Sequence, residues 1–189
     1  MKKHIRYKYP AAMYVHCVSH CLNLCLMEAG QVTGIKKAVT LMNKIVVFYH
    51  DSSKRVRNLQ EAIQQKCKES LKIRLKQHCA TRWVEKQEAV RVFKQLLPAV
   101  CASLDDIASW TGDASGKALL FSASLNDAFV VALEVLLSVL EVTKPLSVRL
   151  QGATQDINNA SESVRDCITT LQGMRTDEIF KKIFENAEQ

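Results

Sequence analysis

Helix-breaking residues are scarce in this sequence, and that scarcity limits the folds open to it more than any other feature. Only 3 prolines and 6 glycines occur in 189 residues. Both residue types punctuate the short strands and tight turns of β-rich domains, so their rarity disfavours such architectures and leaves room for long helices. Hydrophobic residues make up 48% of the chain, enough to bury a core. The sequence therefore predicts a mainly α-helical bundle with at most one or two short strands.

Apolar residues recur at helical spacing along most of the chain. Helices are expected over about residues 20–29, 32–49, 55–69, 83–107, 126–150, 156–171 and 176–186, with a short one before residue 126. Pro98 should kink the fourth of these or divide it in two, and Pro145 should kink the helix over 126–150. Residues 11–15 (AAMYV) follow Pro10 and are predicted to form a short strand.

Charge divides the chain into two unlike parts. Residues 1–100 hold 19 Lys and Arg against 6 Asp and Glu, whereas residues 101–189 hold 7 against 13. The turn-rich run 110–116 (WTGDASG) is the best boundary candidate. We therefore expect a basic region over 1–109, a linker over 110–116 and an acidic helical region over 117–189. The basic region has two interpretations, a surface that faces nucleic acid or a solvated face with no polyanion partner.

Cysteine usage and hydropathy bear on the compartment. The 7 cysteines are an odd number, and no apolar segment follows the basic N-terminal run MKKHIRYKYP. Reduced thiols in the nucleus or cytoplasm are therefore expected. The longest apolar run, near 129–140, is interrupted by Glu134 and is too short to span a bilayer. We expect no membrane association.

The densest group of metal-ligating residue types lies in the run HCVSHC. It contains His16, Cys17, His20 and Cys21, with Cys25 one helical turn further on. A zinc site needs four converging ligands, usually two close pairs joined by a loop. The second pair here would be His78 and Cys79, whose adjacent side chains point apart in regular structure. The spacing therefore predicts no metal site, and these residues are interpreted as a capping histidine and small apolar thiols.

A second signal is Thr81-Arg82-Trp83, at a predicted helix start after the basic connector over residues 70–82. An indole can stack on a base while a guanidinium binds phosphate, so the pair suits nucleic acid. The alternative is that the Trp83 ring anchors the core, as a tryptophan at a helix start commonly does.

These two segments resemble two sequence blocks of the hAT superfamily of DNA transposases. The run from Tyr14 to Leu24 (YVHCVSHCLNL) is similar to that family's HCxxHxLNL block, and the run from Cys79 to Lys86 (CATRWVEK) is similar to its C-x-TRW block. The sequence also resembles domesticated relatives that carry zinc-finger MYM-type or THAP modules. The resemblance covers about residues 9–100 and continues loosely to the end.

The resemblance implies an RNase H-like core interrupted by a helical insertion, with residues 1–109 as part of that core and the start of the insertion. Members of the family use two Asp and one Glu to hold two Mg²⁺ or Mn²⁺ ions for DNA cleavage. The positions that match the family's DNA-contacting residues are Cys17, His20, Arg82 and Trp83.

The sequence departs from the family pattern at the residues that DNA cleavage requires. No Asp or Glu precedes Glu28, so the two upstream catalytic acids are missing, and the third acid follows the insertion in the family. We therefore expect no catalytic residue, no metal or other cofactor, and a central fragment of a transposase that retains at most weak DNA binding through its basic half. Two alternatives remain open, a helical module that binds a protein partner through its C-terminal helices, and a mobile-element remnant with no selected function.

Overall fold

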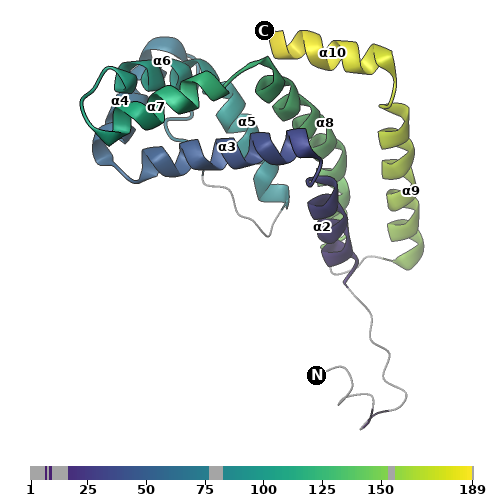
Figure 1. The fold of residues 1–189 in the computed structure, drawn as a ribbon. Coiled ribbons are helices and arrows are strands. Elements are labelled where there is room, and N and C mark those ends of the chain that lie inside the picture. Colours follow the sequence, from purple (N-terminus) through teal and green to yellow (C-terminus); the bar gives the residue numbers. More distant parts are fainter. Residues whose placement is uncertain (1–6, 8, 10–16, 77–82, 153–155, 189) are drawn as a thin grey trace.

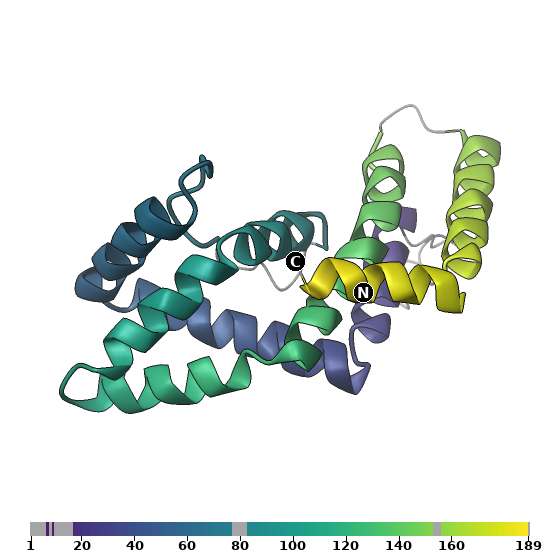
Figure 2. The ribbon, with the colours of Figure 1, turned by 90° about the horizontal axis from the view of Figure 1, so that it is seen from above.

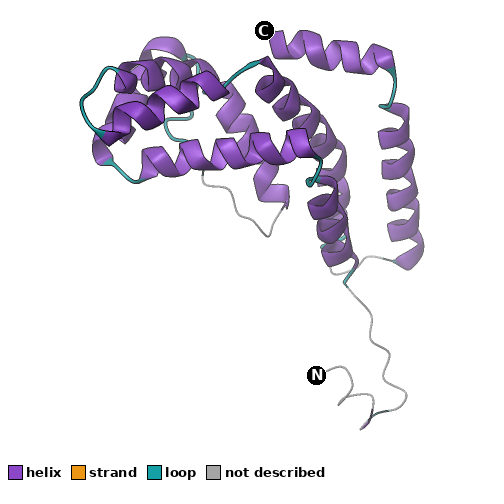
Figure 3. Cartoon of the chain, viewed as in Figure 1, coloured by secondary structure: helices purple, strands orange, loops and turns teal. Residues whose placement is uncertain are grey.

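A computed structural model describes residues 7, 9, 17–76, 83–152 and 156–188. Within these residues the chain forms nine helices and no strand, which confirms the mainly α-helical prediction (Figure 3). The helices are α2 (Val18–Ala29), α3 (Thr33–His50), α4 (Ser53–Lys66), α5 (Trp83–Gln95), α6 (Leu97–Ala108), α7 (Asp113–Ser124), α8 (Asp127–Arg149), α9 (Ile157–Gly173) and α10 (Asp177–Glu188). The strand predicted over 11–15 lies outside the described residues.

Side-chain caps and prolines determine several of the helix ends. Ser52 caps α4, since its hydroxyl accepts a hydrogen bond from the Arg55 backbone N–H at 3.5 Å, and Asn126 caps α8 in the same way through the Phe129 N–H at 3.1 Å. The long helix expected over 83–107 is divided at Leu96, and Pro98 occupies the first turn of α6, where no intrahelical donor is required. Pro145, by contrast, lies inside α8, which continues to Arg149.

Helix α8 is the axis of the structure. It packs against α3 and α5 on one side, and α9 and α10 fold back against it (Figure 1). A second layer is formed by α6, which packs between α4 and α7. One hydrophobic cluster joins the two layers, because residues of α3, α5, α6 and α8 contribute to it together. Its largest fully buried members include Met42, Phe93, Leu104, Leu133 and Leu140.

A chain of hydrogen bonds joins α3, α4 and α6 and runs from this core to the surface. Tyr49 is 1% exposed, and its hydroxyl donates to Ser103 Oγ at 2.9 Å. The Ser103 hydroxyl donates to Asn58 Oδ1 at 2.6 Å, and Asn58 Nδ2 donates to Asp106 Oδ2 at 2.5 Å. Burial raises the pKa of the Tyr49 phenol well above its ordinary value, against a smaller opposing effect of the Ser103 hydrogen bond. The phenol therefore remains protonated and serves as a structural donor.

The interrupted apolar run of α8 has a structural explanation. Glu134 is 6% exposed and forms an ion pair with Lys94 of α5. A carboxylate at this depth requires a cation to offset its desolvation. The pair joins α5 to α8 beside the contact between the Phe93 and Phe129 rings, whose centroids are 6.0 Å apart.

The predicted linker over 110–116 contains a tight turn and the beginning of α7. Gly112 has φ 100°, a backbone conformation that side-chain-bearing residues rarely adopt, and it precedes the first residue of α7. The Ser115 hydroxyl then donates to the Ala108 carbonyl at 2.5 Å, which ties α7 back to the end of α6. The division of the chain into two domains stays a prediction.

No single helix of the described residues has the length and apolar character needed to cross a membrane. Helices α7 and α8 meet that criterion only as a pair, by length and composition alone, and they bend by 70° where they join.

We predict that Tyr49→Phe lowers the free energy of unfolding by about 1 to 2 kcal/mol, because the variant removes a buried donor and leaves Ser103 Oγ one partner short. Urea denaturation monitored by circular dichroism measures this difference. Tyr9→Phe is the matched control, since Tyr9 is 61% exposed and its variant should unfold like the original chain. A Tyr49→Phe variant as stable as that control would mean that the hydrogen-bond chain does not stabilise the fold.

Candidate nucleic-acid interface

The corner between α3 and α4 positions a basic surface. Phe48 and Tyr49 are buried at the end of α3, and their rings meet edge to face with centroids 5.6 Å apart. Arg55 of α4 reaches back across the corner. Its Nε donates to the Phe48 carbonyl at 2.6 Å, and its guanidinium carbon lies 4.3 Å from the Phe48 ring centroid. These contacts fix the direction in which α4 leaves α3.

The segment that follows α4 is held against this corner. Leu75 is 4% exposed and anchors the segment in the core, and His50 Nε2 lies 3.3 Å from the Leu75 carbonyl oxygen, within hydrogen-bond distance. Upstream, the Ser70 hydroxyl accepts a hydrogen bond from the Lys72 N–H at 3.1 Å, which forms a local turn. Residues 70–76 therefore take a defined path beside α4, although they form no helix or strand.

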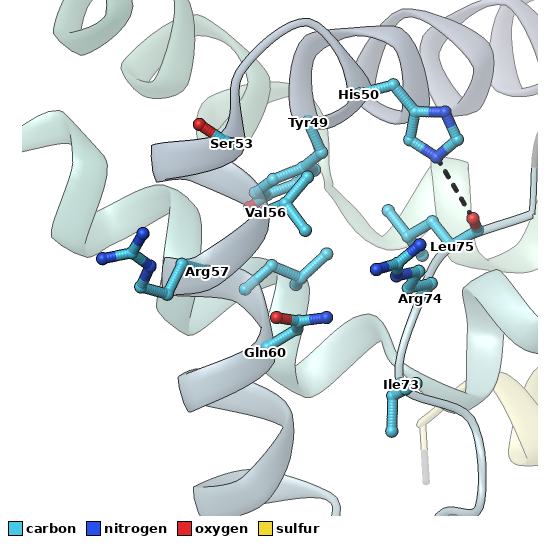
Figure 4. A pocket seen from close by; sticks show the side chains of 10 residues that line it. Tyr49, His50, Ser53, Val56, Arg57, Gln60, Ile73, Arg74 and Leu75 are labelled. Carbon is cyan, nitrogen blue, oxygen red and sulfur yellow. Dashed lines mark hydrogen bonds between the residues drawn. The ribbon is translucent and has the colours of Figure 1, made fainter.

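A hollow of about 470 Å³ lies between α4 and this segment (Figure 4). Its floor is apolar, formed by Tyr49, Val56, Leu59, Ile73 and Leu75, and its polar groups come from His50, Ser53, Arg57, Gln60 and Arg74. In Figure 4 the Arg74 side chain lies next to His50 and Leu75, while Arg57 extends from the other flank of α4. Two guanidinium groups thus border one hollow from two different segments.

The cations in this part of the chain fall into two groups. Residues 53–76 include eight Lys and Arg but only two acids, Glu61 and Glu69. Four of the cations are engaged within the protein: Lys54 over the Trp110 ring, Arg55 on Phe48, and Lys72 and Lys76 on Glu88. The other four are Arg57, Lys66, Lys68 and Arg74, all exposed. None of these four forms an ion pair with a carboxylate of the described residues.

This second group has members beyond the hollow, at the end of α4 and just after it. Lys66 and Lys68 border a neighbouring depression, lined also by Gln65, Glu69, Ser70 and Gln95. Lys66 lies about 14 Å from Arg57 along the axis of α4, at roughly 1.5 Å per residue, and about half a turn around it, so the two side chains leave opposite faces of the helix. Phosphates along one strand of a duplex recur at about 3.4 Å of axis length. We name Arg57, Lys66, Lys68 and Arg74 the basic surface.

Glu88 of α5 neutralises the adjacent lysines. Its Oε1 lies 3.3 Å from Lys72 Nζ and 3.4 Å from Lys76 Nζ. Hydrogen bonds from Lys72 and, more weakly, Lys76 hold the pKa of the Glu88 carboxyl below its ordinary value, against the opposing effect of burial. The carboxylate thus fixes the end of the 70–76 segment to α5.

The four residues predicted from the sequence to contact DNA are only partly described. Cys17 directly precedes α2, where its side chain makes no capping hydrogen bond, and its thiol is exposed. His20 lies exposed on the first turn of α2. Arg82 lies outside the described residues, as does the Trp83 side chain, although Trp83 is the first residue of α5. The role of these four residues in DNA contact stays a prediction.

Metal-ligating and thiol groups do not gather into a site in the described part of the chain. No set of three His, Cys, Asp or Glu side chains there is close enough to hold a metal ion. The described cysteines are free thiols, and burial raises the pKa of the Cys101 and Cys167 thiols. A raised pKa disfavours the reactive thiolate, so these two cysteines act as apolar core residues.

The sequence indicated the cations of α4 but not how they are arranged. Nothing in it pointed to the contact between His50 and the Leu75 carbonyl, 25 residues further on, because that contact depends on the path of residues 70–76. The burial of Leu75 between exposed Arg74 and Lys76 is the one local signal of that path.

We predict that Glu88→Gln lowers the free energy of unfolding at neutral pH by about 0.5 kcal/mol, the usual size for a partly exposed ion pair. Because the folded-state pKa of Glu88 is depressed, its contribution is present above the unfolded-state pKa and is lost as the pH falls through the folded-state pKa. Urea denaturation across a pH series should show the difference from the original chain at pH 7 and a steady decrease of that difference in the acidic range. Glu61→Gln is the control, and an equal loss at every pH would contradict the ion-pair explanation.

Known proteins that are similar to this chain include two mammalian repressor proteins. It is 30% identical over 191 residues to the human protein named 52 kDa repressor of the inhibitor of the protein kinase, and 29% identical over 192 residues to the mouse protein of the same name. Both matches cover 95% of this chain. No family model matches the chain, and no solved structure matches it significantly. The chain is thus similar to these repressor proteins almost throughout, and it spans 25% of their length.

Proposed function

We propose that this chain is a non-catalytic, helical region of a hAT-transposase-derived protein, and that it binds the phosphate backbone of DNA through the basic surface. The observation that carries the proposal is the set of four exposed cations, Arg57, Lys66, Lys68 and Arg74, that have no carboxylate partner among the described residues while their neighbours do. Exposed cations bind polyanions by releasing condensed counterions.

The shape of the hollow supports the same function. Arg57 and Arg74 approach it from two segments, so both guanidinium groups can grip phosphates of one strand. The apolar floor beside them, with Val56 and Ile73, offers a surface for the face of an unpaired base. We therefore propose single-stranded or distorted DNA rather than regular duplex as the ligand.

The hAT resemblance supports a nucleic-acid role, and the composition of the described residues supports binding without catalysis. Two-metal DNA cleavage requires three carboxylates converging on one site, and the described acids form no such cluster. Within this proposal, Cys17, His20, Arg82 and Trp83 would make additional DNA contacts near the first residues of α2 and α5.

A protein partner is the second candidate function. The relatives are named for repressing an inhibitor of a protein kinase, which suggests a role that involves other proteins. In this chain, α9 and α10 leave large apolar side chains exposed, among them Ile168, Phe180 at 54% and Phe184 at 43%. Apolar side chains gathered on two adjacent helices are a common feature of protein-binding surfaces.

We predict that the chain binds a labelled single strand of about 20 nucleotides with a strong dependence on salt. Arg57→Gln/Arg74→Gln should weaken binding by about 10-fold and reduce the slope of log K against log salt by about 1.4, or roughly 0.7 for each phosphate that the variant no longer neutralises. Glu88→Gln should strengthen binding, because it leaves Lys72 and Lys76 without their carboxylate partner. Fluorescence anisotropy across a salt series measures all three effects.

Arg165→Gln/Arg175→Gln is the matched control, since it removes the same charge from exposed positions at α9 and the turn that follows it. It should leave affinity and slope nearly unchanged. Equal weakening by both double variants would mean that only net charge matters and would reject the basic surface as a site. Absence of binding at low salt would reject the DNA function itself and favour the protein-partner role.

A further inference from the structure

An unengaged side-chain amide lines the hollow beside α4. Four residues line that hollow from one face of the helix, at positions i, i+3, i+4 and i+7: Ser53, Val56, Arg57 and Gln60. In Figure 4 the Gln60 amide lies beside α4, between Val56 and Ile73. Within the described part of the chain, no residue forms a hydrogen bond with this amide. Gln60 is half-buried, so its amide borders the hollow and can still reach a ligand.

The neighbouring amide of α4 is engaged within the fold. Asn58 Oδ1 accepts a hydrogen bond from the Ser103 hydroxyl at 2.6 Å, and Asn58 Nδ2 donates to Asp106 Oδ2 at 2.5 Å. Gln60, by contrast, presents both an acceptor oxygen and a donor nitrogen to whatever enters the hollow. A side-chain amide of this kind can bind two atoms of a nucleic-acid base at once, one as donor and one as acceptor.

The parts of the hollow that a ligand can reach are mainly aliphatic. Ile73 is 62% exposed, and Val56 is half-buried. The Tyr49 ring, which also lines the hollow, is 1% exposed, so it offers no face for stacking. The His50 ring lies at the end of the hollow in Figure 4, with its Nε2 3.3 Å from the Leu75 carbonyl oxygen. A base that enters this hollow therefore gains more from aliphatic contact than from aromatic stacking.

Thymine is the DNA base that matches these groups. It carries a 5-methyl group, which aliphatic side chains recognise and which cytosine, adenine and guanine lack. It is also the DNA base without an exocyclic amino group. Arg57 and Arg74 border the hollow as donors without acceptor atoms, so they favour the two carbonyl oxygens of thymine over an amino group. The adjacent N3–H and O4 of thymine offer the Gln60 amide one donor and one acceptor.

We propose that this hollow binds an unpaired thymine and that Gln60 is the residue that reads its edge. The proposal rests on the DNA-binding function proposed above and names the nucleotide that the hollow selects. The Gln60 carbonyl accepts a hydrogen bond from thymine N3–H, and its amide nitrogen donates to O4. The 5-methyl group contacts Val56 and Ile73. Arg57 and Arg74 bind the phosphates on either side of the base.

The test compares four labelled strands of about 8 nucleotides, a length within the usual range of a single-strand site. They are oligomers of thymidine, deoxyuridine, deoxycytidine and deoxyadenosine, and fluorescence anisotropy with the whole chain at low salt gives the four affinities. We expect the thymidine strand to bind about 4-fold more tightly than the deoxyuridine strand, which differs only by the methyl group. The deoxycytidine and deoxyadenosine strands should bind about 5-fold more weakly than the thymidine strand, or weaker still, because they lose a two-point base contact.

Two variants assign the preference to particular side chains. Ile73→Ala should reduce the preference for thymidine over deoxyuridine without unfolding the chain, because the Ile73 side chain is largely exposed and contacts the methyl group. Gln60→Glu should reverse the preference for thymidine over deoxycytidine, because a carboxylate only accepts hydrogen bonds and pairs with the cytosine amino group. Gln172→Glu is the matched control, with the same charge change on α9, at the other side of the molecule from α4 in both views (Figures 1 and 2). It should leave every affinity ratio unchanged.

The outcomes separate thymine recognition from DNA binding itself. Equal affinities for the thymidine and deoxyuridine strands would overturn thymine recognition and leave the DNA function standing. An unchanged ratio of thymidine to deoxycytidine affinity in Gln60→Glu would do the same. Tightest binding of the deoxyadenosine strand would overturn the proposal in favour of a purine. Absence of binding to every strand at low salt would reject the DNA function together with this inference.

Discussion

The burial of Tyr49 is the interaction around which the other helices are arranged. A phenol that is 1% exposed needs a partner for its hydroxyl, and Ser103 of α6 supplies it, with Asn58 of α4 as the next link. Helix α6 is thereby fixed to the corner between the consecutive helices α3 and α4. His50 then contacts the segment 70–76, and Phe48 contacts α7 through Phe121. The proposed DNA surface begins at this corner, so its geometry depends on one buried side chain and its two neighbours.

The distribution of ion pairs explains why only some cations of this strongly basic region are available to bind a ligand. Cations that stabilise the fold have partners: Lys94 pairs with buried Glu134, Lys72 and Lys76 with Glu88, and Lys54 lies over Trp110. Those on the basic surface have none among the described carboxylates. The first set contributes to folding, and the second remains available for ligands. Net charge alone, at +7, would not distinguish the two sets.

Helix content could be predicted from the sequence because it depends on local signals. The apolar period of α3, the Ser52 cap and Pro98 each act within a turn or two, and the helices lie within a few residues of the predicted ranges. The sites depend on contacts that no local pattern encodes. Arg74 reaches the hollow through the path fixed by Leu75 and His50. The family resemblance pointed instead to Cys17, His20, Arg82 and Trp83, whose DNA contacts stay a prediction.

The proposed function requires that the unpaired cations of α4 and the following segment form the DNA surface. Titration of the isotopically labelled chain with a short single strand, followed by amide and side-chain nuclear magnetic resonance shifts, locates the bound strand residue by residue. We expect the shifts to concentrate at residues 53–76, with the Arg57 and Arg74 guanidinium groups and the His50 ring among the most perturbed, while α9 and α10 stay unchanged. Shifts centred on α9 and α10, or spread evenly over every exposed lysine and arginine, would contradict this assignment.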